Sequence, residues 1–322
     1  MFSRYYKTRI TSGELLSNIL EYKGSRDDDE LSMPGYINLL IKTCSAFSTI
    51  ANIFIINNIV INKFRAKDFL LFIPTIIYST ISIMSANRGN ILMLILASFC
   101  AWYILYHRFH GWDRHMTWMV LSKGAKIAIV VFVLFWEFMV VVRNADLSNS
   151  YNGFMTYICA YFSGPLAGIN MYIRQGGTTN PQWWGEETFV ALNNNLNTLF
   201  GISHSSSRFL EYRSGFGFSV VNIYPSFRRF YHDFGFVGVS FLSIVIVQRY
   251  VTSRIYYLVK RSENAGIDVW LCVYAFFFYT VPYTLTDELF YASNISISGL
   301  IKLLILLVVY YFMTIGVLAT SK

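Results

Sequence analysis

The sequence predicts an all-α membrane protein, a polytopic transmembrane helical bundle of about seven spans with a re-entrant or interfacial segment and a large periplasmic loop. Its composition and its long apolar runs predict this class. Apolar residues make up 55% of the 322 residues and charged residues only 14%, against about 45–50% and about 25% in soluble domains. A soluble domain of this size needs a charged surface that this chain lacks. A membrane-spanning helix, in contrast, needs about 20 mostly apolar residues.

Seven apolar runs have the length that a membrane span requires. They lie near residues 36–61, 68–86, 90–107, 125–143, 234–250, 267–286 and 297–318. An eighth uncharged run, 154–173, is interrupted by Gly164, Pro165 and Gly168. We expect this eighth run to be re-entrant or interfacial rather than to cross the bilayer.

Basic residues predict the orientation, because they concentrate on the cytoplasmic side of a membrane. The connection 249–266 carries four basic residues, whereas 287–296 carries none and is acidic. Placing the first inside and counting backwards puts 144–233 outside. The expected organisation has four parts: a polar N-terminal segment 1–35, first transmembrane helices 36–143, a periplasmic loop region 144–233 containing 154–173, and C-terminal transmembrane helices 234–322.

Several site types are excluded by the absence of their motifs. The four cysteines are widely spaced in apolar runs, so the sequence indicates neither a zinc site nor a disulfide framework. It contains no Walker loop, no dinucleotide-binding glycine motif and no GxSxG turn. We therefore expect no cofactor and no metal. The net charge of +8 is attributed to contact with anionic membrane lipids, and no nucleic acid partner is expected.

Arginine is distributed asymmetrically. Residues 127–259 contain no lysine but eight arginines. A guanidinium binds phosphate through two parallel hydrogen bonds, so an arginine-only set indicates a pyrophosphate site. The alternative is that these side chains reach lipid headgroups. The candidate ligands are the six arginines of the outer region and one at a span boundary: Arg143, Arg174, Arg208, Arg213, Arg228, Arg229 and Arg88.

Three residues are candidates for catalysis. His232 and Asp233 are neighbours, and an imidazole is a suitable general base at neutral pH. His204 is the other histidine of the outer region. The alternative for Asp233 is that it caps a helix beginning near Phe234, and the alternative for His232 is an interfacial histidine.

Two further groups of residues have alternative interpretations. Trp183 and Trp184 in "QWWGEE" either stack against sugar rings or anchor a loop at the bilayer interface. Asp287 and Glu288 follow a predicted span. They either serve the site or pair with an arginine that holds helices together.

Three segments, in this order, resemble the O-antigen polymerases of the Wzy type. "SANRGNILMLIL" at 85–96 is similar to the S-x-x-R-G span start of that family. "NIYPSFRRFYHDFGFVGV" at 222–239 is similar to its N-x-Y-x-x-x-R-x-F-Y-x-D-F-G-x-x-G segment, and "YFSGPLAGINMYI" at 161–173 fits between them. Members of this family usually have about ten or more spans, so this chain is expected to be a short version or a fragment.

The resemblance implies a multi-pass enzyme of the bacterial inner membrane. Such an enzyme polymerises undecaprenyl-pyrophosphate-linked repeat units at the periplasmic face, and its pathway includes a chain-length regulator and a flippase. The matching positions are Arg88, Arg228, Asp233 and Gly235. Arg229 stands where the family often has proline and His232 at a variable position, so a base role for His232 follows from its chemistry alone. The alternatives are an O-antigen ligase-like transferase and a flippase or transporter of lipid-linked glycan.

Overall fold

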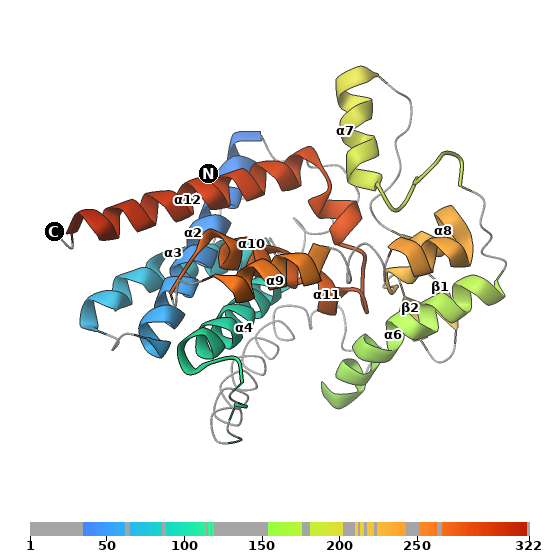
Figure 1. Ribbon diagram of the computed structural model, residues 1–322. Helices are drawn as coiled ribbons and strands as arrows, with labels where there is room; N and C mark the ends of the chain where they lie inside the picture. Colours follow the sequence, from blue (N-terminus) through green and yellow to red (C-terminus); the bar gives the residue numbers. More distant parts are fainter. Residues whose placement is uncertain are drawn as a thin grey trace, which may run out of the picture. The chain divides into compact units, whose positions relative to one another are not determined.

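The computed structural model describes residues 35–61, 65–85, 88–113, 115–116, 118, 154–175, 181–201, 210–211, 213–215, 218–221, 224–242, 251–262 and 266–320. Within these ranges the regular structure is helical apart from one pair of short strands. The chain divides into two compact units, Met1–Asn149 and Ser150–Lys322. Figure 1 shows the elements of both units.

Four helices lie in the described part of the first unit. Helix α2 (Gly35–Val60) packs against α3 (Phe72–Met84), which the short helix η2 (Ala66–Leu71) precedes, and against α4 (Arg88–His110). Ala51 of α2 and Ala101 of α4 are fully buried. Small side chains at such positions let apolar helices approach closely, which is how helices associate where water provides no driving force.

Polar side chains link α2, α3 and α4. The Asn52 side chain on α2 accepts a hydrogen bond from Thr75 Oγ1 on α3 (2.8 Å) and donates one to Ser98 Oγ on α4 (3.3 Å). Ser48, one turn before Asn52, donates to the same threonine hydroxyl (3.3 Å). One asparagine therefore connects three otherwise apolar helices.

The second unit contains more, and shorter, elements. Helix α6 contacts both strands of an antiparallel pair, α7 packs against η4, and α10 contacts α9, α11 and α12. The elements are α6 (Phe154–Arg174), α7 (Val190–Phe200), β1 (Arg213–Gly215), β2 (Phe218–Val221), α8 (Phe227–Gly238), α9 (Ser253–Arg261), α10 (Val269–Phe278), α11 (Thr280–Tyr283), η4 (Phe290–Asn294) and α12 (Ile297–Thr320). Helix α7 ends at Gly201, whose φ of 65° is the left-handed conformation typical of a C-terminal glycine.

Helix α8 differs from the prediction. A helical segment does begin close to Phe234, directly after a kink at Gly235, but the first segment of α8 begins at Phe227 and contains Asp233. Asp233 as the cap of the second segment is wrong, because its carboxylate accepts the backbone N–H groups of Glu187 and Thr188. The helix bends at Gly235, whose φ of 66° and ψ of −164° are not helical. Only glycine adopts this conformation without strain. The charged residues 228–233 are therefore helical and lie just before a bend.

Four helices are long and apolar enough to cross a membrane: Gly35–Val60, Ala66–Met84, Gly89–His110 and Ile297–Ile315. They correspond to four of the seven predicted spans. The predicted span 267–286 consists of two shorter helices, because Pro282 has no N–H to donate to the carbonyl of Phe278 and the helix is interrupted at Tyr279. The predicted span 125–143 lies outside the described residues, as do residues 243–250 of the span 234–250.

The run 154–173 forms one helix, α6, which continues through Gly164, Pro165 and Gly168. The sequence led us to expect that these residues would interrupt it. Pro165 leaves the Tyr161 carbonyl without its usual N–H partner, but the helical assignment is unbroken. Helix α6 is not among the four helices with the length and hydropathy of a span.

Candidate functional site

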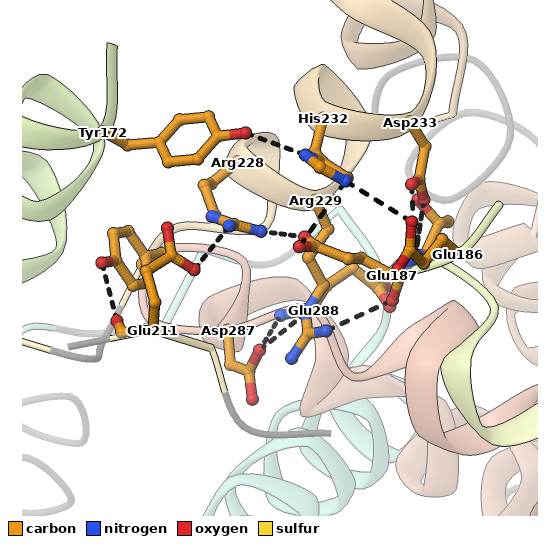
Figure 2. Close-up of polar contacts among 12 residues, drawn as sticks. Tyr172, Glu186, Glu187, Glu211, Arg228, Arg229, His232, Asp233, Asp287 and Glu288 are labelled. Atoms are coloured by element: carbon orange, nitrogen blue, oxygen red, sulfur yellow. Dashed lines mark hydrogen bonds and ion pairs between the residues drawn. The ribbon is translucent and has the colours of Figure 1, made fainter. Parts of the chain in front are cut away.

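The candidate site is built around two arginines, a histidine and an aspartate of α8 (Figure 2). Arg228 and His232 are four residues apart, as are Arg229 and Asp233, so each pair occupies one face of the helix. Both arginines and Asp233 are buried, whereas His232 is half-buried. Ionised groups at this depth need partners, since an unpaired buried charge is strongly destabilising.

Glu187 is the partner that all four side chains share. Its carboxylate forms an ion pair with Arg228 Nη1, and its Oε1 lies 3.9 Å from His232 Nε2. Its backbone carbonyl accepts a hydrogen bond from Arg229 Nη1 (3.2 Å), and its backbone N–H donates to the Asp233 carboxylate (3.2 and 3.3 Å). One residue of a turn outside α8 thus connects both arginines, the histidine and the aspartate.

Arg228 has its guanidinium buried between two carboxylates and two aromatic rings. Its Nη2 donates to Glu211 Oε2 at 2.6 Å, while Nη1 donates to Glu187. Its guanidinium lies over the rings of Tyr172 and Tyr224, with Cζ 4.3 and 5.4 Å from their centroids. Burial lowers the pKa of Arg228 to about 10, so it stays protonated at neutral pH.

Arg229 connects α8 to the segment that precedes η4. Its Nε lies 3.4 Å from Asp287 Oδ1, which also accepts the backbone N–H of Glu288 at 2.7 Å. Of the two sequence interpretations of Asp287, the structure supports pairing with an arginine. Glu288 is fully enclosed, and its carboxylate accepts the backbone N–H groups of the first turn of η4. Burial raises the pKa of Glu288 to about 7, despite these hydrogen bonds and the nearby positive charge of Arg229.

His232 and Asp233 differ in the capacity of their side chains to exchange protons. The Asp233 carboxylate accepts backbone N–H groups of Glu187 and Thr188, the latter at 2.7 Å, so its lone pairs are used to fix that turn. His232 Nδ1 lies 2.8 Å from the Tyr172 hydroxyl. Its Nε2 is 3.8 Å from Glu186 and 3.9 Å from Glu187, beyond hydrogen-bond length.

The two tryptophans lie in the same turn as Glu187. Trp184 is 74% exposed and stacks on Phe189, with ring centroids 5.2 Å apart and planes inclined by 14°. Trp183 is half-buried. Gly185, with a φ of 69°, allows the turn that separates the tryptophans from Glu186 and Glu187. An exposed indole face beside the ionised cluster is a surface on which a sugar ring can stack.

The remaining predicted site residues fall in three groups. Arg174 is the exposed last residue of α6, and Arg213 begins β1. Arg88 is the first residue of α4 in the first unit. Three predicted residues lie outside the described residues: Arg143, His204 and Arg208.

Sequence reasoning missed the partners of the arginines. Tyr172, Glu186, Glu187 and Glu211 were not predicted as site residues, yet each contacts Arg228 or lies beside His232. The sequence does contain an indication of the carboxylate partners, because residues 144–233 contain only five acidic side chains. Buried arginines recruit carboxylates, so the few available ones were the natural candidates.

The described residues contain no group of three or more histidine, cysteine, aspartate or glutamate side chains that could hold a metal ion. No family model matches the chain, and neither a curated protein nor a solved structure matches it.

Proposed function

We propose that the chain is a membrane glycosyltransferase that polymerises undecaprenyl-pyrophosphate-linked oligosaccharide repeat units into O-antigen or capsular polysaccharide at the periplasmic face of the bacterial inner membrane. One observation supports this most directly. A half-buried histidine has one nitrogen held by Tyr172 and the other near two carboxylates, on the same helix as two buried arginines. This arrangement combines a proton acceptor with fixed positive charge.

In the proposed reaction, a hydroxyl at the non-reducing end of the acceptor attacks the anomeric carbon of the donor glycan. The new glycosidic C–O bond forms as the bond from the anomeric carbon to the pyrophosphate oxygen breaks. The polyprenyl pyrophosphate leaves with the electron pair, and the hydroxyl proton passes to His232 Nε2. Glu186 and Glu187, 3.8 and 3.9 Å away, stabilise the imidazolium that forms.

The arginines would stabilise the charge that develops on the leaving pyrophosphate. Both terminal nitrogens of Arg228 already donate to carboxylates. A phosphate oxygen that binds Arg228 must therefore exchange with Glu187 or Glu211. Glu211 is the more exposed partner, with 36% of its side chain accessible against 14% for Glu187, so we assign the exchange to Glu211.

The other components follow from the same proposal. The energy of the reaction resides in the lipid-linked pyrophosphate, so the residues on α8 need no nucleotide and no metal. The exposed face of Trp184 would stack on a sugar ring of the acceptor. A flippase that supplies repeat units and a chain-length regulator would be the protein partners.

Deletion of the gene, followed by gel analysis of surface polysaccharide, tests the proposal. Loss of the long ladder with a single repeat unit retained supports a polymerase. Loss of all capped material would instead indicate a ligase or a flippase, and an unchanged ladder would rule out the enzyme.

Complementation of the deletion then tests the residues. His232→Gln should lower polymerisation by about 10²-fold or more, the range for loss of a general base. His204→Gln is the matched control, since His204 is the competing candidate. Loss of activity in the His204 variant, with activity kept in the His232 variant, would refute His232 as the base.

A further inference from the structure

Tyr172 contacts two residues of α8 through two different parts of its side chain. Its ring face carries the guanidinium of Arg228, with 4.3 Å between Cζ and the ring centroid. Its hydroxyl lies 2.8 Å from Nδ1 of His232. Because Arg228 and His232 are one helical turn apart, a single tyrosine from α6 reaches both of them (Figure 2).

The Tyr172 side chain is held in place before any substrate is considered. The residue is only 3% exposed and packs with Leu210 and Tyr224 in a buried cluster, which Tyr231 of α8 also contacts. The Tyr231 ring meets the Tyr172 ring edge-on, with centroids 6.5 Å apart. A tyrosine packed in this way has few alternative rotamers, so its hydroxyl defines a fixed point for the imidazole.

We propose that Tyr172 is the positioning residue of the transferase site, holding His232 through Nδ1 so that Nε2 is the nitrogen that exchanges a proton with the sugar hydroxyl. This inference rests on the proposed function. Tyr172 is too deeply buried to touch the glycan and acts through His232.

In the proposed arrangement the neutral imidazole carries its proton on Nδ1. A neutral imidazole has one N–H, and the hydrogen bond at one nitrogen decides which nitrogen carries it. The Tyr172 hydroxyl and Nδ1 are within hydrogen-bond length, and with the proton on Nδ1 this N–H donates to the hydroxyl oxygen, whereas both carboxylates near Nε2 are beyond that length. The lone pair of Nε2 is then available to a substrate hydroxyl.

The carboxylates become important after the proton is taken up. The imidazolium has an N–H at both nitrogens, one directed at Tyr172 and the other at Glu186 and Glu187. The two negative charges stabilise this form by attraction, and the sequence neighbour Asp233 adds to it. Arg228 and Arg229, earlier on α8, are positive charges that oppose it. Glu187 and Glu211 pair with Arg228, and Asp287 pairs with Arg229.

The Tyr172→Phe variant tests the hydroxyl separately from the ring. Phenylalanine keeps the aromatic face under Arg228 and removes only the oxygen at Nδ1. Tyr231→Phe is the matched control, because it removes a neighbouring hydroxyl from the same cluster. Both proteins are compared with wild type for elution as a single folded species in detergent. Tyr172→Leu, which removes the ring face as well, measures the contribution of the ring to folding.

The first measurement does not depend on activity. The chain has five histidines, so ¹⁵N-histidine labelling of the full-length protein in lipid nanodiscs gives a simple spectrum. The His232 signals are identified by their loss in His232→Gln. At alkaline pH we expect wild type and Tyr231→Phe to show the Nδ1–H tautomer, and Tyr172→Phe to lose it. An Nε2–H tautomer in wild type, or an unchanged tautomer in Tyr172→Phe, would overturn the proposal.

The second measurement is polymerisation with purified lipid-linked repeat units. Tyr172→Phe should lower kcat by about tenfold or more at an unchanged KM, by analogy with the loss on removing a group that orients a metal-binding histidine. Tyr231→Phe should match wild type. A change in KM alone would contradict a positioning role. A wild-type protein that forms no polymer would refute the proposed function, while the tautomer would still decide whether Tyr172 sets the protonation of His232.

Discussion

The carboxylate of Glu187 and the guanidinium of Arg228 form an ion pair in which the arginine side chain is 3% exposed and the glutamate side chain 14%. Glu187 also receives Arg229 at its carbonyl and supplies its N–H to Asp233. The turn that contains Glu187 is thus bound to α8 by charge–charge contacts and by backbone hydrogen bonds. This relationship explains why α8 can keep two arginines buried.

Arg228→Lys should destabilise the protein although the charge is retained. The two terminal nitrogens of Arg228 serve two different carboxylates, and a single ammonium group cannot reproduce that fork. Loss of one charged hydrogen bond should lower the free energy of unfolding by about 2 kcal/mol, measured by denaturant titration in detergent. Arg174→Lys, at an exposed position, should change it by less than about 0.5 kcal/mol. Equal stabilities of the two variants would contradict the requirement for two separate hydrogen bonds from Arg228 to Glu187 and Glu211.

Glu288 should make stability depend on pH between its ordinary pKa of 4.5 and its value of about 7 in the folded protein. Burial raises this pKa, so in that window the folded state binds a proton that the unfolded state has released. The contribution of Glu288 to stability is therefore present below pH 4.5 and is lost as pH rises to about 7. Relative to Glu288→Gln, the free energy of unfolding of wild type should fall by roughly 3 kcal/mol across this window.

This comparison requires the difference between the two proteins, because other groups also titrate between pH 4.5 and 7. Denaturant titrations at several pH values supply it. A difference that stays constant with pH would show that Glu288 has the same pKa in both states.

The helical class and the approximate positions of four helices long and apolar enough to cross a membrane could be predicted from composition and from apolar runs. Local patterns failed where a tertiary contact decides the outcome. The sequence predicts that Asp233 caps the helix that begins near Phe234, but its carboxylate accepts N–H groups of Glu187 and Thr188, which are far away in sequence. No local pattern reveals such a partner.

In the candidate site, too, the residue types could be predicted from the sequence, whereas the tertiary contacts could not. The residue types on α8 indicated phosphate binding and proton transfer, because arginine and histidine have that chemistry in any context. The sequence could not reveal that Tyr172 lies over Arg228 and beside His232. These three residues meet only through the packing of α6 against the segments that precede α8, and the long separation along the chain hides this contact.

Gly235→Ala should destabilise the protein, because Gly235 has a φ of 66° and a ψ of −164°, a conformation that a Cβ strains. We expect a loss of about 1–3 kcal/mol in the free energy of unfolding. Gly164→Ala is the matched control: this glycine is helical, and an added Cβ would meet nothing within 4 Å. That change should be neutral or stabilising by up to about 1 kcal/mol. If both variants lowered the free energy of unfolding by the same amount, the backbone conformation of Gly235 would not be the reason for the loss.

Asn52→Leu should loosen the association of α2, α3 and α4. The asparagine accepts from Thr75 and donates to Ser98, and leucine of similar size removes both bonds. Hydrogen bonds between helices in a membrane each contribute about 0.6–1.7 kcal/mol, so we expect a loss of about 1–3 kcal/mol in the free energy of unfolding. Thr80→Val is the control, since the Thr80 hydroxyl donates only to the carbonyl of Ile76 in its own helix. If both variants lost the same stability, local helix effects rather than the link between helices would explain the result.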